Sequence, residues 1–258
     1  IIIVFLVNTI FYLRENIMKR FYLDSIDSTN DYCKKNLSFL PSFCVVYTFN
    51  QTHGKGRNQR TWVSVPYQNL SFSIVVKKTI AQPASLSIMA ALAMIQTLKH
   101  FQIEAQIKWP NDILIHKKKV CGILIEAITQ DTQSNYVIGI GLNVNTTFFD
   151  ETLKKKATSL FLELNKKISL KKVLSIYLKK WHKLFVSFEK NKDTILQEYK
   201  KYSCVLHQKI EFEYQGQFCN GIVLDILDDG SLLVQMNNKK ITINYGEVSL
   251  KNFYEEGV

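Results

Sequence analysis

Residues 51–62 read Gln-Thr-His-Gly-Lys-Gly-Arg-Asn-Gln-Arg-Thr-Trp and lie between two apolar, strand-like runs at 43–49 and 70–76. The glycines on either side of Lys55 allow the backbone to turn tightly and to approach a ligand closely. Lys55, Arg57 and Arg60 put three cations on one loop, and a guanidinium matches carboxylate and phosphate oxygens. Trp62 adds a flat surface on which a purine can stack. The stretch predicts a loop that binds a nucleotide and an acid; the alternative is a plain basic hairpin.

The composition is that of a globular protein with a basic surface. The chain has 258 residues, 47% of them hydrophobic, with 33 Lys+Arg against 22 Asp+Glu and a net charge of +11. This length allows one large domain, or a large and a small one. The charge favours nucleic acid, an anionic membrane or an acidic substrate or partner. Five cysteines without a Cys-x-x-Cys spacing indicate reduced, buried thiols in a cytoplasmic protein and no zinc site.

The first seventeen residues are apolar and do not begin with methionine. They are short for a bilayer span and lack the charged start and cleavage site of a signal peptide. Met18 is the expected natural start, so residues 1–17 are interpreted as an upstream or disordered apolar extension. A membrane-surface anchor is the alternative, and no membrane association is expected.

Hydrophobic periodicity predicts the main elements. Residues 21–23 read as a strand, and Ser28 or Thr29 can cap a helix that runs to about residue 36. Residues 84–101 should form a buried helix, and the region 166–190 an amphipathic one. From about residue 204 short alternating strands indicate a small β-barrel. The expected domains are therefore 18–203 and 204–258.

Two further motifs lie at strand ends. Pro110 interrupts the run 107–115 and places Lys108, Asn111 and Asp112 at a turn between apolar segments. An ordinary turn is the alternative, since Pro-Asn-Asp is good turn chemistry. Gly122 interrupts a later strand, which suggests a bulge or the close approach of another group, and the two glycines of 136–145 again permit close approach.

In this order and spacing, the Ser28-Thr29-Asn30 triplet, the 51–62 loop, the Lys-Trp-Pro-Asn-Asp motif, Lys119-Val-Cys-Gly122 and Gly139-Ile-Gly-Leu-Asn143 resemble the biotin protein ligases. These enzymes attach biotin to carboxylase carrier domains. The resemblance covers roughly residues 18 to 258. It departs from the family pattern in two places, where Lys55 replaces an arginine and Gln59 a glycine. Gln59 makes a positive φ less comfortable there.

The resemblance implies a role for each matching residue. Those expected to bind biotin are Ser28, Thr29, Asn30, Gln51, Lys55, Gly56, Arg57, Lys119 and Gly122. Those expected at the nucleotide are Arg60, Trp62, Lys108, Asn111 and Asn143. Lys119, Arg57 and Lys108 are the expected catalytic residues, and Asp112 is a candidate partner of Mg²⁺.

The resemblance also implies a fold and a reaction. The fold is α+β, a mixed sheet with helices packed on one face, followed by a small SH3-like barrel whose end matches residues 246–251. The reaction uses ATP, Mg²⁺ and biotin, forms biotinyl-5′-AMP, and transfers biotin to a lysine of a biotin carboxyl carrier protein. Bringing carboxylate and triphosphate together requires cationic stabilisation and alignment. A monomer or a homodimer is expected.

Three other functions compete with this one. A lipoate or octanoate ligase shares the fold and a key lysine, although the basic loop, the Trp-Pro-Asn-Asp motif and the barrel favour a biotin ligase. A biotin-responsive transcription factor needs a recognition domain, and the 27 residues before Ser28 are too few for one. Specific DNA binding is therefore not expected. A catalytically inactive binding module is the third alternative.

Overall fold

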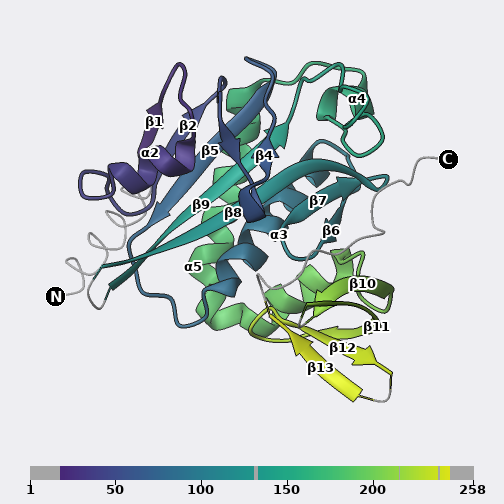
Figure 1. Ribbon diagram of the computed structural model, residues 1–258. Helices are drawn as coiled ribbons and strands as arrows, with labels where there is room; N and C mark the ends of the chain where they lie inside the picture. The colour runs from purple at the N-terminus through teal and green to yellow at the C-terminus, as the bar shows by residue number, and fades with distance from the viewer. Residues whose placement is uncertain (1–17, 131–132, 215, 238, 245–258) are drawn as a thin grey trace.

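The computed structural model describes residues 18–130, 133–214, 216–237 and 239–244. Its main element is a seven-stranded sheet with the order β1-β2-β5-β9-β8-β7-β6 (Figure 1). β1 pairs with β2 in parallel and all other neighbours are antiparallel, so the sheet is mixed, as predicted. The strands are β1 (Arg20–Tyr22), β2 (Cys44–Thr48), β5 (Asn69–Val76), β6 (Gln106–Lys108), β7 (Asp112–Ile115), β8 (Lys118–Gln130) and β9 (Gln133–Asn143).

Two long helices cover one face of this sheet. α3 (Ala84–His100) is buried along most of its length, and α5 (Leu170–Tyr202) buries one apolar side that includes Tyr177 and Trp181. The Ser169 hydroxyl caps α5 by accepting a hydrogen bond from the backbone N–H of Lys172. Both helices belong to the large core cluster, and α5 begins within the predicted region 166–190 and extends beyond its end.

The short helix α2 (Thr29–Lys35) lies on the opposite face of the sheet. The predicted packing of helices on one face therefore holds for α3 and α5 but not for α2. Side chains alternate along a strand, and Cys44 and Val46 of β2 therefore face α2 while Val45 joins the large core. α2 buries Cys33 in this second cluster. It leaves part of the sheet face uncovered.

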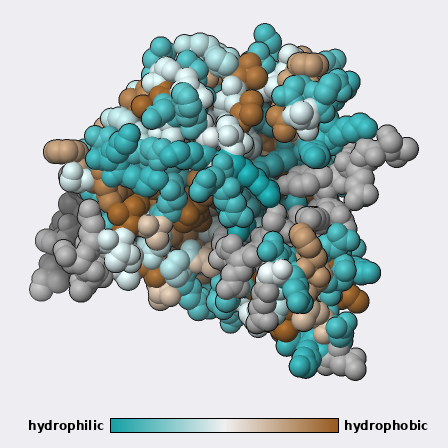
Figure 2. All heavy atoms as spheres, in the orientation of Figure 1, coloured by the Kyte–Doolittle hydropathy of each residue, from teal (hydrophilic) through white to brown (hydrophobic). Residues whose placement is uncertain are grey.

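A small hairpin covers the remaining part of that face. It consists of β3 (Gly54–Lys55), the 3₁₀ turn η1 (Arg57–Gln59) and β4 (Thr61–Trp62), and it is the loop singled out in the sequence. Figure 2 shows hydrophilic residues gathered at the centre of this face, where Figure 1 places the hairpin. α4 (Leu160–Leu164) lies near the upper right edge in Figure 1.

The C-terminal part forms a second sheet of four antiparallel strands, in the order β10-β11-β12-β13. They are β10 (Lys209–Tyr214), β11 (Gln217–Ile226), β12 (Leu232–Met236) and β13 (Lys239–Ile243). This small antiparallel sheet is the type expected of an SH3-like barrel. Its apolar residues join the same large core cluster as the main sheet. The predicted barrel end at 246–251, like the extension 1–17, lies outside the described residues.

Within the described ranges, no helix combines the length and apolar character that crossing a bilayer requires. The long helix α5 carries charged residues along its outer side, which fits a helix that covers a sheet.

Candidate functional site

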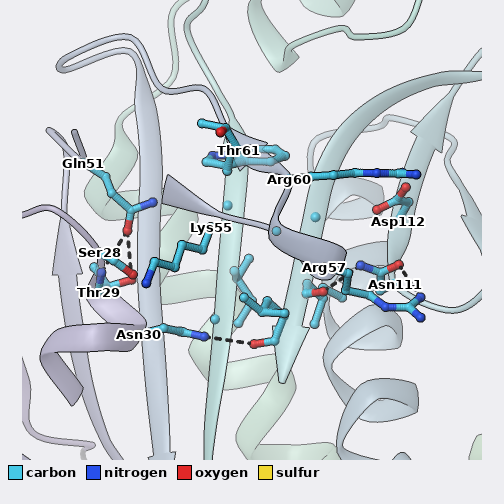
Figure 3. A pocket seen from close by; sticks show the side chains of 18 of the residues that line it. Ser28, Thr29, Asn30, Gln51, Lys55, Arg57, Arg60, Thr61, Asn111 and Asp112 are labelled. Atoms are coloured by element: carbon cyan, nitrogen blue, oxygen red, sulfur yellow. Dashed lines mark hydrogen bonds between the residues drawn. The ribbon is translucent and has the colours of Figure 1, made fainter. Parts of the chain in front are cut away.

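A pocket opens on the sheet face shared by α2 and the β3–β4 hairpin. Its floor consists of residues 122–124 of β8 and 139–141 of β9, and the hairpin lies over it (Figure 3). The space between its walls is about 790 Å³, part of it open to solvent. The residues that line it are Ser28, Thr29, Asn30, Gln51, Lys55, Gly56, Arg57, Arg60, Thr61, Trp62, Asn111, Asp112, Lys119, Gly122, Ile123, Leu124, Gly139, Ile140 and Gly141.

Two glycines of β9 make this pocket possible. A Cβ at Gly139 would overlap the side-chain amide of Asn30, and a Cβ at Gly141 would lie 2.6 Å from Nε1 of Trp62. Only glycine allows these side chains to approach the strand so closely. The prediction that the strand glycines mark the close approach of another group agrees with this geometry.

One end of the pocket, here called the neutral end, is made mainly of uncharged hydrogen-bonding groups, and Lys55, which also reaches it, is paired with Asp31. The Gln51 side-chain oxygen accepts from the Thr29 backbone N–H at 2.9 Å, and the Thr29 hydroxyl lies 3.2 Å away. Ser73 Oγ lies 2.8 Å from Thr29 Oγ1 and 2.6 Å from Asn30 Oδ1, under the first turn of α2. Ser28 caps this helix through the Asp31 N–H. These side chains therefore have fixed orientations before any ligand binds.

The amide of Asn30 is held from three directions. Its Nδ2 donates to Oε2 of Glu126 at 2.8 Å and to the Leu124 carbonyl at 3.3 Å, while its Oδ1 faces Ser73. Glu126 also forms an ion pair of 2.6 Å with Lys34. These contacts fix the orientation of the Asn30 amide at the pocket wall.

The hairpin is tied to α2 by an ion pair. Lys55 Nζ lies 2.6 Å from Asp31, whose carboxylate also lies 2.9 Å from Lys34. Together these two lysines lower the pKa of Asp31 although burial opposes them. At the tip of the hairpin Asn58 and Gln59 have φ of 52° and 59°. Gln59 therefore adopts the left-handed conformation in which glycine is the usual residue.

The other end of the pocket is cationic (Figure 3). Arg57 and Arg60 extend from the hairpin towards Asn111 and Asp112, and Arg57 Nη1 lies 3.5 Å from the Asn111 side-chain oxygen. Asn111 Nδ2 donates to the Ile123 carbonyl at 2.9 Å. Lys119 Nζ forms an ion pair of 2.6 Å with Asp112. This end can bind an anion.

Trp62 lies over the floor of the pocket. Its ring approaches Gly141 and Gly122, and Lys119 Nζ lies 5.5 Å from the ring centre. Its Nε1 is buried without a hydrogen-bond partner among the described residues. A ligand group or a water molecule would be needed to satisfy this N–H.

Lys108 and Asn143 do not line the pocket. Lys108 is 5% exposed, and burial lowers its pKa from 10.5 to about 8, although Asp112 raises it. Asn143 accepts from Asn69 at 2.7 Å and donates to the Thr158 carbonyl at 3.0 Å. Its amide is thus committed to buried partners, and this geometry does not support the predicted place in the nucleotide pocket.

No cluster of three or more potential metal ligands occurs in the described part of the chain. Asp112 is the one carboxylate among the residues that line the pocket, and it is paired with Lys119. This donor set fits Mg²⁺ only as an ion held mainly by phosphate oxygens and water, with one carboxylate at most.

Sequence reasoning missed four residues that support the pocket. Asp31, Lys34, Glu126 and Ser73 hold Lys55, Asn30 and Thr29 in place. Glu126 carried a signal, because it is a charged residue within the otherwise apolar run 120–128. The others look like ordinary helix and strand residues.

Comparisons with known proteins agree with this architecture. A model of the biotin/lipoate A/B protein ligase family matches residues 22–143, and a model of the biotin protein ligase C-terminal domain matches residues 206–251. The bifunctional ligase/repressor BirA of Bacillus subtilis is 31% identical over 210 residues, which are 78% of this chain and 65% of that protein. The biotin--[acetyl-CoA-carboxylase] ligase of Mycobacterium tuberculosis is 28% identical over 79% of this chain and 77% of its own length. In BirA of Bacillus spizizenii the match spans 41% of the protein.

One solved structure matches this chain over nearly the whole length of both proteins. The biotin protein ligase from Aquifex aeolicus, in complex with biotin and ATP, superimposes with a TM-score of 0.81 at 26% identity. The match covers 90% of this chain and 98% of that chain. It includes both the mixed sheet with its helices and the small C-terminal sheet, so the predicted fold class is confirmed. This chain therefore belongs to the biotin protein ligase family.

Proposed function

We propose that this chain attaches biotin to a lysine of a carrier protein in an ATP-dependent reaction with biotinyl-5′-AMP as the intermediate. The observation that carries the proposal is the pocket with two chemically different ends. One end offers hydrogen-bonding side chains, with Lys55 there paired to Asp31, and the other end is lined by Arg57, Arg60 and Lys119. Biotin itself has this division. Its ureido ring offers N–H donors and a carbonyl acceptor, and its valerate chain ends in a carboxylate.

The neutral end is proposed to hold the ureido ring. Ser28, Thr29, Asn30 and Gln51 converge there with orientations fixed by their mutual hydrogen bonds. A site built to hydrogen-bond a ligand rejects an analogue that lacks those groups, because its buried polar groups are then left unpaired. The dithiolane ring of lipoate has no such groups, so this end favours biotin over lipoate.

The cationic end is proposed to hold the biotin carboxylate and the phosphates of ATP. An oxygen of the carboxylate attacks the α-phosphorus, a new O–P bond forms, and pyrophosphate leaves with the electrons of the broken P–O bond. The step brings anions together, and Lys119, Arg57 and Arg60 are the cations that line this end. Fixed charges at the position of the developing charge are effective because they need no reorganisation. Lys108, behind this wall, adds to the positive potential.

Mg²⁺ would arrive with ATP, and Asp112 is the side chain that would contact it. When bound, the ion would neutralise phosphate charge. Lys119 would then exchange its contact with Asp112 for a substrate oxygen, since both side chains line the pocket.

In the second step, the amine of a carrier lysine attacks the carbonyl of the mixed anhydride. A C–N bond forms, AMP leaves, and the amine loses a proton. The proposed partner is a biotin carboxyl carrier protein, and the basic surface suits an acidic partner. All five cysteines are free thiols, which supports a reducing, cytoplasmic location.

The test is mass spectrometry of a purified carrier fragment after incubation with the chain and ATP, with biotin in one reaction and lipoate in another. We expect the carrier to gain the mass of one biotinyl group, in the biotin reaction only. A lipoyl adduct alone would reassign the chain as a lipoate ligase. No adduct in either reaction, together with no biotin-dependent ATP–pyrophosphate exchange, would identify an inactive binding module.

A further inference from the structure

The Lys-Trp-Pro-Asn-Asp segment is held by residues from the C-terminal part of the chain. The Trp109 side chain is 1% exposed, and its Nε1 donates a buried hydrogen bond of 2.9 Å to the Gly230 carbonyl. Two residues earlier, the Ile107 carbonyl accepts from the Cys204 N–H at 3.0 Å. The end of β6 is therefore bound on two sides by residues that follow α5.

Gly230 belongs to a turn between β11 and β12 that is internally fixed. The Gly230 N–H donates to the Leu227 carbonyl, and the Leu227 N–H donates to the Ser231 carbonyl, both at 2.8 Å. Asp229 accepts from the Ser231 N–H at 3.0 Å. Gly230 has φ of 81°, and a Cβ there would lie 3.1 Å from Cβ of Ala84 at the start of α3. The turn is thus seated closely against α3 and Trp109, and a side chain at position 230 would both crowd Ala84 and require a left-handed backbone.

A short connection leads from Trp109 to the cationic end of the pocket. Pro110 follows, with its carbonyl 3.3 Å from the Ser87 hydroxyl of α3. Asn111 and Asp112, which both line the pocket, come next. Asn111 is fixed on its other side, because its carbonyl accepts from the Ile123 N–H at 2.9 Å. A displacement of Trp109 would therefore be transmitted directly to two residues of the pocket wall.

We propose that Trp109 and the turn at Gly230 are positioning elements, through which the C-terminal domain sets Asn111 and Asp112 for binding the triphosphate. This inference rests on the proposed function and adds to it a means by which one domain controls ATP binding in the other. It also predicts selectivity between substrates. The neutral end of the pocket is built from α2, β5 and Gln51. Among the described residues, none of these forms a hydrogen bond with the turn at Gly230. Binding of biotin should therefore not depend on the Trp109–Gly230 contact.

The test uses Trp109→Phe in the full chain, which keeps an aromatic ring but removes the N–H donor and leaves the Gly230 carbonyl unpaired. We expect the KM for ATP in biotin-dependent pyrophosphate exchange to rise about five- to tenfold. The KM for biotin should change less than about twofold. Trp181→Phe is the matched control, because Trp181 is also fully buried and its Nε1 has no hydrogen-bond partner within the described residues. This control should keep the wild-type KM for ATP.

Gly230→Ala tests the same contact from the other domain, since the added Cβ pushes the turn away from α3. It should raise the KM for ATP in the same way. The double variant should lose little more than the worse single variant, because both changes break one contact. Should Trp109→Phe not fold, Gly230→Ala carries the test alone, with thermal unfolding measured for each variant.

Two results would overturn the inference while leaving the proposed function intact. One is an unchanged KM for ATP in both folded variants. The other is an equal rise in the KM for ATP and for biotin, which a general loss of structure would produce. If the wild-type chain itself showed no exchange, the proposed function would fail first, and the two failures are therefore distinguishable.

Discussion

The ammonium group of Lys119 lies 2.6 Å from Oδ1 of Asp112 and, through a separate contact, 5.5 Å from the centre of the Trp62 ring. The cation is thus held at the pocket wall by one carboxylate and one aromatic face. Substrate anions entering the pocket would compete with Asp112 for it. This pairing keeps the ammonium group of Lys119 at the pocket wall, beside the space where we propose that the carboxylate and the α-phosphate meet.

Lys119→Ala should therefore abolish most adenylate formation. Loss of one group that stabilises developing charge costs about a hundred- to a thousandfold in rate. The measurement is the rate of biotin-dependent pyrophosphate exchange at saturating ATP. Lys117→Ala is the control, because it removes the same charge from an exposed residue in the neighbouring β7–β8 turn. An exchange rate within a few fold of wild type in Lys119→Ala would refute the assigned role.

Arg57→Ala should form the adenylate but fail to retain it. Arg57 crosses from the hairpin to Asn111 on the opposite wall, so the variant loses a connection that closes the pocket. Biotinyl-5′-AMP would escape and label lysines of bystander proteins. The measurement is biotin incorporated into an added unrelated protein. Arg20→Ala is the control, since Arg20 bonds Ser175 at 2.9 Å and does not line the pocket. Strict selectivity for the carrier in Arg57→Ala would contradict this role.

Local patterns in the sequence were sufficient to predict the strands and the helix that frame the site. The apolar runs 43–49 and 70–76 correspond to β2 and β5, and the alanine-rich run 84–101 corresponds to α3. Their periodicity and composition are properties of neighbouring residues. The strand glycines were also readable, because Gly139 and Gly141 leave space that Asn30 and Trp62 occupy.

Contacts between residues that lie far apart in the sequence could not be predicted from the sequence. The Lys55–Asp31–Lys34–Glu126 network joins the hairpin, α2 and β8, and depends on how α2 lies across the sheet. A single sequence does not contain that placement. The same reason applies to Asn143, whose partner Asn69 lies 74 residues away. Its position in a glycine-rich strand suggested the pocket, but its amide is bound elsewhere.

Ser73→Ala should weaken biotin binding without affecting ATP. Ser73 contacts Thr29 and Asn30 from below, so its hydroxyl orients both side chains at the neutral end. We expect the KM for biotin to rise about fivefold, the loss of roughly one hydrogen bond, with the KM for ATP unchanged. Ser71→Ala is the matched control. Ser71 is two residues earlier on the same strand face, and its hydroxyl makes no hydrogen bond in the described part of the chain. Equal effects of both variants would show that the hydroxyl of Ser73 has no orienting role.

Lys108→Met should stabilise the fold, and the gain should depend on pH. Burial lowers the pKa of Lys108 from 10.5 to about 8, so the folded chain binds this proton less tightly than the unfolded chain. The cost of burying the charge is complete below about pH 8 and fades as the pH rises towards 10.5. The shift sets an upper limit of about 3 kcal/mol on the gain at pH 7. Asp112 keeps its ion pair with Lys119 in this variant.

The measurement is the free energy of unfolding in urea for wild type and Lys108→Met at pH 7 and at pH 10. Wild type should approach the variant at the higher pH, because the buried amine is then neutral in the folded chain. Exposed Lys117→Met serves as the control and should show a small difference at both pH values. A stability gain of equal size at pH 7 and pH 10 would mean that Lys108 is not a destabilised cation, and that the variant gains from packing alone.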